Sequence, residues 1–204
     1  MRDYNNRQIS DIKSIALYNI RWVAYLKNSI NLNYMKLRIK TTKTTLLIFG
    51  IYQILGALAG FGIVAWLLQQ TGTINGIALL IFLIAIGLYA LSMKAGSVLL
   101  RKDYKRGIIL SMINQLFQIV AIAVGGYKFD FSSGARLNTG FNFTDGFLAK
   151  FDFGLSSAFN ISWNSGQEFF IYINILAIFL LYVLVDIYEE LFKKKDSDEV
   201  VKLT

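Results

Sequence analysis

Residues 126–163 read GYKFDFSSGARLNTGFNFTDGFLAKFDFGLSSAFNISW, and this stretch decides the fold class. Its odd-numbered positions are mostly apolar and its even-numbered positions mostly polar. A period of two is typical of β-strands, because successive side chains of a strand point to opposite faces of a sheet. The stretch nevertheless lies between two apolar runs that are long enough to cross a membrane.

Turn residues divide the stretch into four strands. The breaks are Ser132–Gly134, Thr144–Gly146 and Ser156–Ser157, and Asp-Gly between apolar runs is a strong hairpin signal. The pattern predicts a four-stranded antiparallel β-meander with strands near residues 127–131, 135–143, 147–155 and 159–163. Gly140, inside the second strand, is a candidate for a β-bulge.

The predicted meander gathers its aromatic side chains on one face. The residues expected to form a partner or membrane interface are Phe129, Phe131, Phe141, Phe143, Phe151, Phe153, Phe159 and Trp163. Buried aromatic rings of this number exceed on the order of 1,000 Å², whereas soluble surfaces rarely expose more than a few hundred. Three covers are possible: the membrane or the ends of the protein's own spans, a partner subunit, or other copies of the chain.

Four apolar runs are long enough to be membrane spans, at residues 44–70, 77–93, 108–126 and 169–188. None contains Lys or Arg, and the whole chain is 55% hydrophobic with a mean hydropathy of +0.48. The sequence therefore predicts an α-helical membrane protein with four transmembrane helices. The β-meander is inserted between the third and fourth of them.

The positive charges predict the orientation. Only Lys128, Arg136 and Lys150, of 21 Lys and Arg residues, lie between residues 126 and 168. Positive residues stay on the cytoplasmic side, so we expect both termini in the cytoplasm and the insert outside it. This pattern is that of an integral protein of a bacterial inner membrane without a cleavable signal peptide. The excess of positive charge is explained by the membrane orientation and gives no reason to expect nucleic acid as a partner.

The chain accordingly divides into five expected regions. They are a basic amphipathic cytoplasmic arm (1–43), helices one to three with a basic cytoplasmic linker at 94–107 (44–126), the aromatic insert (127–168), helix four (169–190) and a charged cytoplasmic tail (191–204). Residues 9–30 of the arm show a moderate helical apolar face. That face fits either a helix lying on anionic lipid or one packing beneath the bundle.

Several polar residues lie inside the predicted spans. They are Gln53, Ser111, Asn114, Gln115, Gln118, Asn174 and Asp186. The four on span three, from Ser111 to Gln118, form one helical stripe that has to face protein or water. One interpretation is a pathway for an ion or solute with Asp186 titrating. We favour hydrogen bonds between helices, because no acid or His lies deeper in the membrane. Gly56 and Gly60 give span one a small face for close helix packing.

The residue types narrow the possible functions. The chain has no Cys and no His, which removes thiolate nucleophiles, the usual zinc sites and the commonest acid–base side chain. No catalytic residue, cofactor site or metal ligand is predicted. The first hypothesis is a non-enzymatic accessory or scaffold subunit of a larger inner-membrane complex, which contacts lipids and other subunits or copies of itself. The alternative is an oligomeric conductor or membrane-perturbing effector that uses the polar stripe of helix three. An interfacial lipid enzyme has the least support.

Overall fold

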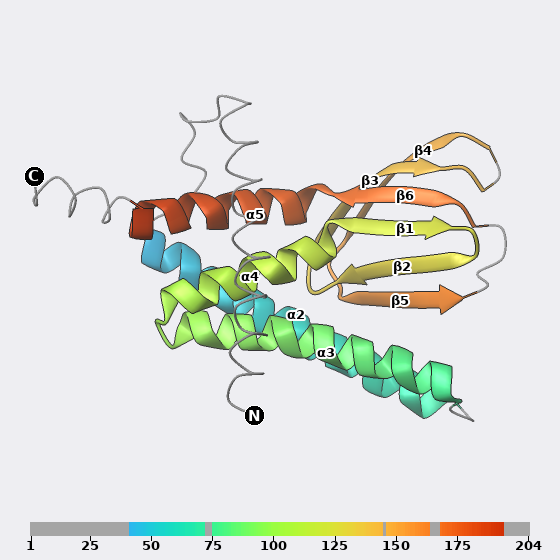
Figure 1. The fold of residues 1–204 in the computed structure, drawn as a ribbon, viewed down its shortest axis with the longest axis horizontal. Coiled ribbons are helices and arrows are strands. Elements are labelled where there is room, and N and C mark those ends of the chain that lie inside the picture. The colour runs from blue at the N-terminus through green and yellow to red at the C-terminus, as the bar shows by residue number, and fades with distance from the viewer. Residues whose placement is uncertain (1–40, 72–74, 145, 164–167, 194–204) are drawn as a thin grey trace, which may run out of the picture. The chain divides into compact units, whose positions relative to one another are not determined.

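The computed structural model describes residues 41–71, 75–144, 146–163 and 168–193 of the chain. Within these ranges it contains helices and a six-stranded antiparallel sheet (Figure 1). The helices are α2 (Thr42–Gln70), α3 (Gly76–Leu100), α4 (Tyr104–Gln118) and α5 (Ile175–Tyr188), followed by a short π-helix, η1 (Glu189–Lys193). Residues 40–181 form one compact unit, and Tyr182–Lys193 belong to a second. The predicted arm at 1–43 and the tail at 191–204 lie almost entirely outside the described residues.

Helices α2 and α3 are long and apolar enough to cross a membrane. Each begins at a capping residue: the Thr41 hydroxyl accepts from the Thr44 amide, and the Asn75 side chain accepts from the Ala78 amide. Helix α3 continues past Met93 to Leu100 and α4 begins at Tyr104, so most of the predicted linker at 94–107 is helical. The first two predicted spans thus correspond to helices.

Glycines let α2 approach its neighbours closely. A Cβ atom on Gly96 of α3 would lie 2.5 Å from the backbone oxygen of Gly50. One on Gly60 would overlap the ring of Tyr89, and one on Gly56 would lie 2.7 Å from the backbone of Ser133. Gly60 therefore packs against α3, whereas Gly56 packs against a turn of the sheet.

The third predicted span, 108–126, is only partly helical. Helix α4 ends at Gln118, and the chain continues as strand β1 (Val120–Val124). The prediction of one continuous helix is therefore wrong for this segment. Its second half reads VAIAV, and β-branched residues at alternate positions favour a strand. Gly125 and Gly126 both have positive φ, +60° and +83°, and form a two-residue turn into the next strand.

The fourth predicted span also changes type along its length. Residues Phe170–Asn174 form strand β6, and helix α5 begins only at Ile175. The sequence FIYIN again alternates large β-formers. The side chain of Asn174 accepts a hydrogen bond from the Ala177 amide at 3.3 Å, as an N-cap does. The junction between strand and helix thus lies inside a run whose hydropathy does not change.

The sheet has strands β1 to β6 in the spatial order β4-β3-β6-β1-β2-β5. The four strands between the two junctions are β2 (Tyr127–Ser132), β3 (Arg136–Asn142), β4 (Leu148–Gly154) and β5 (Ala158–Trp163). Their bounds agree with the predicted strands to within a residue or two. The predicted meander is nevertheless wrong, because β2 pairs with β5 and not with β3. The two strands from the flanking spans, β1 and β6, lie between β2 and β3 and separate them.

The pairing of β3 is regular on both sides. Gly140 faces Lys150 of β4 and Tyr172 of β6 without an extra residue, so the expected bulge is absent. A Cβ atom on Gly140 would overlap the backbone of Ile171. Glycine at this position therefore allows β6 to approach closely.

The sheet is strongly curved. Two strands separate β2 from β3, which would place them about 14 Å apart in a flat sheet. The Arg136 guanidinium of β3 nevertheless lies 3.9 Å from the Asp130 carboxylate of β2. Both residues occupy even positions, so the even-numbered polar face is concave. We call this concave face the trough. The opposite, convex face, which we call the outer wall, carries the odd-numbered residues of β2 to β6 and the even-numbered residues of β1.

Candidate functional site

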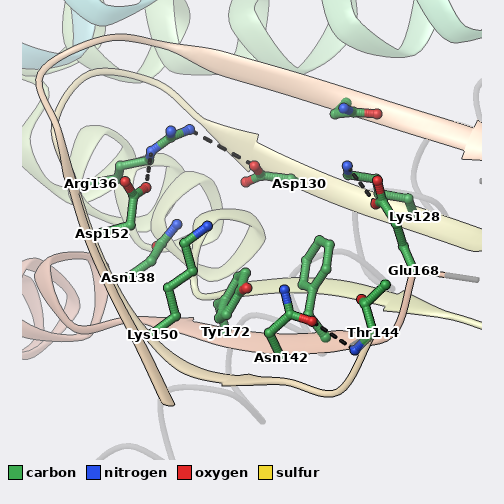
Figure 2. Close-up of a pocket in the computed structure, with 12 residues that line it drawn as sticks. Lys128, Asp130, Arg136, Asn138, Asn142, Thr144, Lys150, Asp152, Glu168 and Tyr172 are labelled. Carbon is green, nitrogen blue, oxygen red and sulfur yellow. Dashed lines mark hydrogen bonds and ion pairs between the residues drawn. The ribbon is translucent and has the colours of Figure 1, made fainter. Parts of the chain in front are cut away.

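The trough encloses a cavity of about 420 Å³ (Figure 2). Its lining comes from strands β2 to β6 and their loops and comprises Lys128, Asp130, Arg136, Asn138, Asn142, Thr144, Lys150, Asp152, Asn160, Glu168, Phe170 and Tyr172. A volume in this range suits a small polar molecule. The three cations and three carboxylates balance in formal charge.

Ion pairs neutralise most of these charges. Lys128 lies 2.8 Å from Glu168, and Arg136 lies 3.2 Å from Asp152 as well as 3.9 Å from Asp130. Burial raises the pKa of the Asp130 carboxyl, while the nearby Arg136 and Lys128 act in the opposite direction. Lys150 has no ion pair with any residue in the described part of the chain. The trough therefore carries one free cation, on the edge strand β4.

Helices α2 and α3 cover one half of the outer wall. Phe131 is 2% exposed and packs against Val64, Ala85 and Tyr89, with ring centroids of Phe131 and Tyr89 5.4 Å apart. Phe129 and Phe159 are partly buried in the same cluster. These three predicted interface residues are therefore covered by the protein's own helices.

The other half of the outer wall is uncovered within the described residues. Phe141 is 45% exposed, Phe151 66% and Phe153 59%. Phe143 lies in the β3–β4 loop and forms ring contacts with Phe141 and Phe147 at 6.2 Å and 5.6 Å. The backbone of Trp163 pairs with Tyr127, but its side chain lies outside the described part. The uncovered region thus follows β3, β4 and the loop between them, and continues onto β6, where Ile171 and Ile173 are also exposed.

Beneath the sheet, polar residues of the helices form a buried hydrogen-bonded cluster. The Ser111 hydroxyl donates to the Gln53 side-chain oxygen at 3.0 Å, and the Asn114 amide donates to the Ser92 hydroxyl at 3.2 Å. Ser92 in turn donates to the backbone oxygen of Gln53. Gln115 is also buried, and its amide nitrogen has no partner among the described residues. The structure thus brings together residues from three predicted spans.

Side chains also satisfy the turns of the sheet that face this cluster. The Gln118 side-chain oxygen accepts from the Ser133 amide at 2.9 Å, and the Ser157 hydroxyl accepts from the Gly134 amide at 3.1 Å. Ser157 also donates to the backbone oxygen of Gly56 at 2.6 Å. The Tyr52 hydroxyl donates to the Ala135 oxygen at 3.2 Å. Sequence reasoning missed Ser133 and Ser157, because Ser in a turn has no signal beyond the turn itself.

Two predicted intramembrane residues occupy other positions. Asn174 links β6 to its neighbours. Its side-chain oxygen accepts from the Leu137 amide at 3.1 Å, and its backbone amide donates to the Ile119 backbone oxygen at 2.7 Å. Asp186 lies on α5 in the second compact unit, partly buried.

The trough itself was not predicted. Its signal was the run of charged and amide residues at even positions, which a sheet with one wetted face also explains. Within the described ranges, no group of three acidic side chains is arranged to hold a metal ion. No protein family, curated protein or solved structure matches the chain.

Proposed function

We propose that the protein is a non-enzymatic subunit of a larger membrane assembly, and that it contacts its partner through the uncovered half of the outer wall. The observation that supports this function is the uneven cover of the aromatic face. Helices α2 and α3 bury Phe131, while Phe141 and Phe151 on the same face remain 45% and 66% exposed. Large exposed apolar patches are typical of interaction sites.

The membrane placement that we propose follows from α2 and α3. Both cross the bilayer with the Lys94–Arg106 end on the cytoplasmic side, in agreement with the charge distribution. The segments α4–β1 and β6–α5 then also extend across it, each as a helix joined to a strand. Fifteen helical and five extended residues of α4–β1 cover about 39 Å, enough for the hydrocarbon core. Both termini are then cytoplasmic.

The sheet lies within the outer half of the bilayer in this placement. Ser157, in the β4–β5 loop, hydrogen-bonds Gly56, the middle residue of the 29-residue helix α2. The strands extend from there along the second half of α2, where Val64 contacts Phe131. An apolar outer wall suits this environment, and the uncovered half then faces either lipid or a membrane-embedded partner. We favour a partner, because the β3–β4 hairpin also has an edge without hydrogen-bonded neighbours.

Substitution of the outer wall tests this function. Phe141→Asp places a charge on the uncovered wall and is expected to release the partner during purification in mild detergent. Asn160→Asp on the trough face of β5 is the matched control and should retain it, because that side chain points away from the wall. Quantitative mass spectrometry of co-purified membrane proteins measures both. Equal recovery of the same proteins with both variants would contradict a partner at the wall.

The conductor hypothesis receives less support. Three residues of the polar stripe of α4, Ser111, Asn114 and Gln118, form hydrogen bonds with Gln53, Ser92 and Ser133, and the stripe is buried. Side chains that already have protein partners are better explained as structural than as the lining of a pathway.

A further inference from the structure

Strand β4 is an edge strand with exposed residues on both faces. It pairs with β3 on one side and with no described strand on the other. Leu148, Phe151 and Phe153 are 64%, 66% and 59% exposed. Unpaired edges of this kind bind other strands readily, and natural proteins normally cover them.

In the membrane placement that we propose, an unpaired edge of β4 is energetically unfavourable. Backbone N–H and C=O groups without partners are strongly destabilising in hydrocarbon, so open sheet edges do not face lipid. The edge of β4 therefore needs a protein strand beside it. The other edge strand, β5, is shielded in part by α2, to which the preceding loop is hydrogen-bonded through Ser157.

The sequence of β4, LAKFDFG, is self-complementary in one antiparallel register. In a two-fold pair centred on Phe151, Lys150 faces Asp152 of the second copy, and this ion pair occurs twice. Ala149 then faces Phe153 of the second copy, and the two Phe151 side chains meet. Facing residues lie on the same side of a sheet, so the aromatic residues continue the outer wall and the charges stay on the trough side.

The neighbouring registers are unfavourable. Centring the pair on Lys150 places two ammonium groups opposite each other, and centring it on Asp152 does the same with two carboxylates. A shift by one residue places polar side chains opposite apolar ones. Lys150 has no ion pair among the described residues, and Asp152, already 3.2 Å from Arg136, keeps further acceptor capacity.

We propose that β4 pairs with β4 of a second copy of this chain about a two-fold axis at Phe151. The pair extends each six-stranded sheet across the interface and gives Lys150 its missing carboxylate. This inference goes beyond the proposed function, since it concerns the edge of the sheet and a second copy, not its outer wall and a different protein.

Cysteine cross-linking tests the register directly, because the chain has no Cys. Phe151→Cys in the full chain, oxidised in native membranes, is expected to give a disulfide-linked dimer, since directly facing residues lie about 5 Å apart. Ala149→Cys alone should not, because its copies would lie about 13 Å apart along the strands. A mixture of Ala149→Cys and Phe153→Cys should cross-link. Phe141→Cys, exposed on the wall of β3, is the control that should stay monomeric.

Charge reversal provides a second test. Lys150→Asp places two carboxylates opposite each other at both ends of the pair and should weaken dimerisation about tenfold or more in detergent. Asp152→Lys should do the same, and co-expression of the two variants should restore dimers. Phe141→Asp should leave the dimer intact, which separates this inference from the proposed function. Absence of a Phe151→Cys dimer, or equal cross-linking of Ala149→Cys, would overturn the proposal.

Discussion

Single polar side chains inside the apolar segments compensate for non-helical backbone. In the membrane placement that we propose, turns of the sheet lie near the centre of the bilayer, where protein groups have to satisfy their N–H and C=O groups. Gln118 and Ser157 accept from the amides of Ser133 and Gly134, and Tyr52 donates to the oxygen of Ala135. Of the polar stripe on α4, Gln118 supports this β-turn, whereas Ser111 and Asn114 form hydrogen bonds with Gln53 and Ser92 of the neighbouring helices.

Gly60 allows α2 to pack closely against the Tyr89 ring of α3. A Cβ atom there would overlap the Tyr89 ring, which packs on Phe131 of the sheet, so Gly60→Ala should lower the free energy of unfolding by about 1–3 kcal/mol. Gly62→Ala, two residues along the same helix, meets nothing within 4 Å and should be neutral or stabilising by up to about 1 kcal/mol. Thermal unfolding in detergent measures both changes. Similar effects of the two substitutions would exclude close packing at Gly60.

At the scale of elements, the chain changes between helix and strand inside two segments whose residues are uniformly apolar. Length and apolarity indicate that a segment can cross a membrane, but both helix and strand satisfy that condition. The alternation of Val or Ile with Ala in residues 120–124, followed by Gly125–Gly126, was the available signal. It was obscured because both faces of this strand are apolar.

The Gly125–Gly126 turn allows a test of the β1–β2 hairpin. Both residues have positive φ, so replacing both by Ala should cost about 2–4 kcal/mol of stability, at roughly 1–2 kcal/mol for each residue. Gly125→Asn should be tolerated, because Asn-Gly is a preferred pair in this type of turn. Resistance to protease in detergent, compared among the three proteins, measures the effect. If the segment were a continuous helix, as the sequence suggested, replacement of both residues by Ala would stabilise it instead.

The strands between residues 127 and 163 could be predicted because each break carries turn residues and one face is apolar. Their order could not, since pairing depends on β1 and β6, which belong to other predicted elements. The trough depends on that order, because curvature brings Asp130 and Arg136 together from strands that are not neighbours. The aromatic outer wall was predicted from alternation alone. The unequal cover of its two halves follows from the packing of α2 and α3, which alternation does not encode.

For the whole molecule, the middle of α2 sets the depth of the sheet in the membrane placement that we propose. Gly56 lies 14 residues from each end of its helix, which corresponds to about 21 Å. The β4–β5 loop is fixed at this level by Ser157. A sheet with a polar concave face and an apolar convex face fits this depth when the concave face opens towards water and the convex face meets lipid or protein. The prediction of a wholly extracytoplasmic insert is therefore replaced here by the proposal of a partly embedded one.

Thiol labelling distinguishes the two placements. Leu155 is 77% exposed in the β4–β5 loop, but an embedded sheet places it in lipid, so Leu155→Cys should react with an impermeant maleimide from neither side of the membrane. Gly76→Cys, at the start of α3 with nothing within 4 Å, should react from outside. Arg101→Cys, at the end of α3, should react only after the membrane is opened. All three should react in denaturing detergent. Labelling of Leu155→Cys from outside at the rate of Gly76→Cys would place the sheet beyond the bilayer and remove the reason for covering the β4 edge with protein.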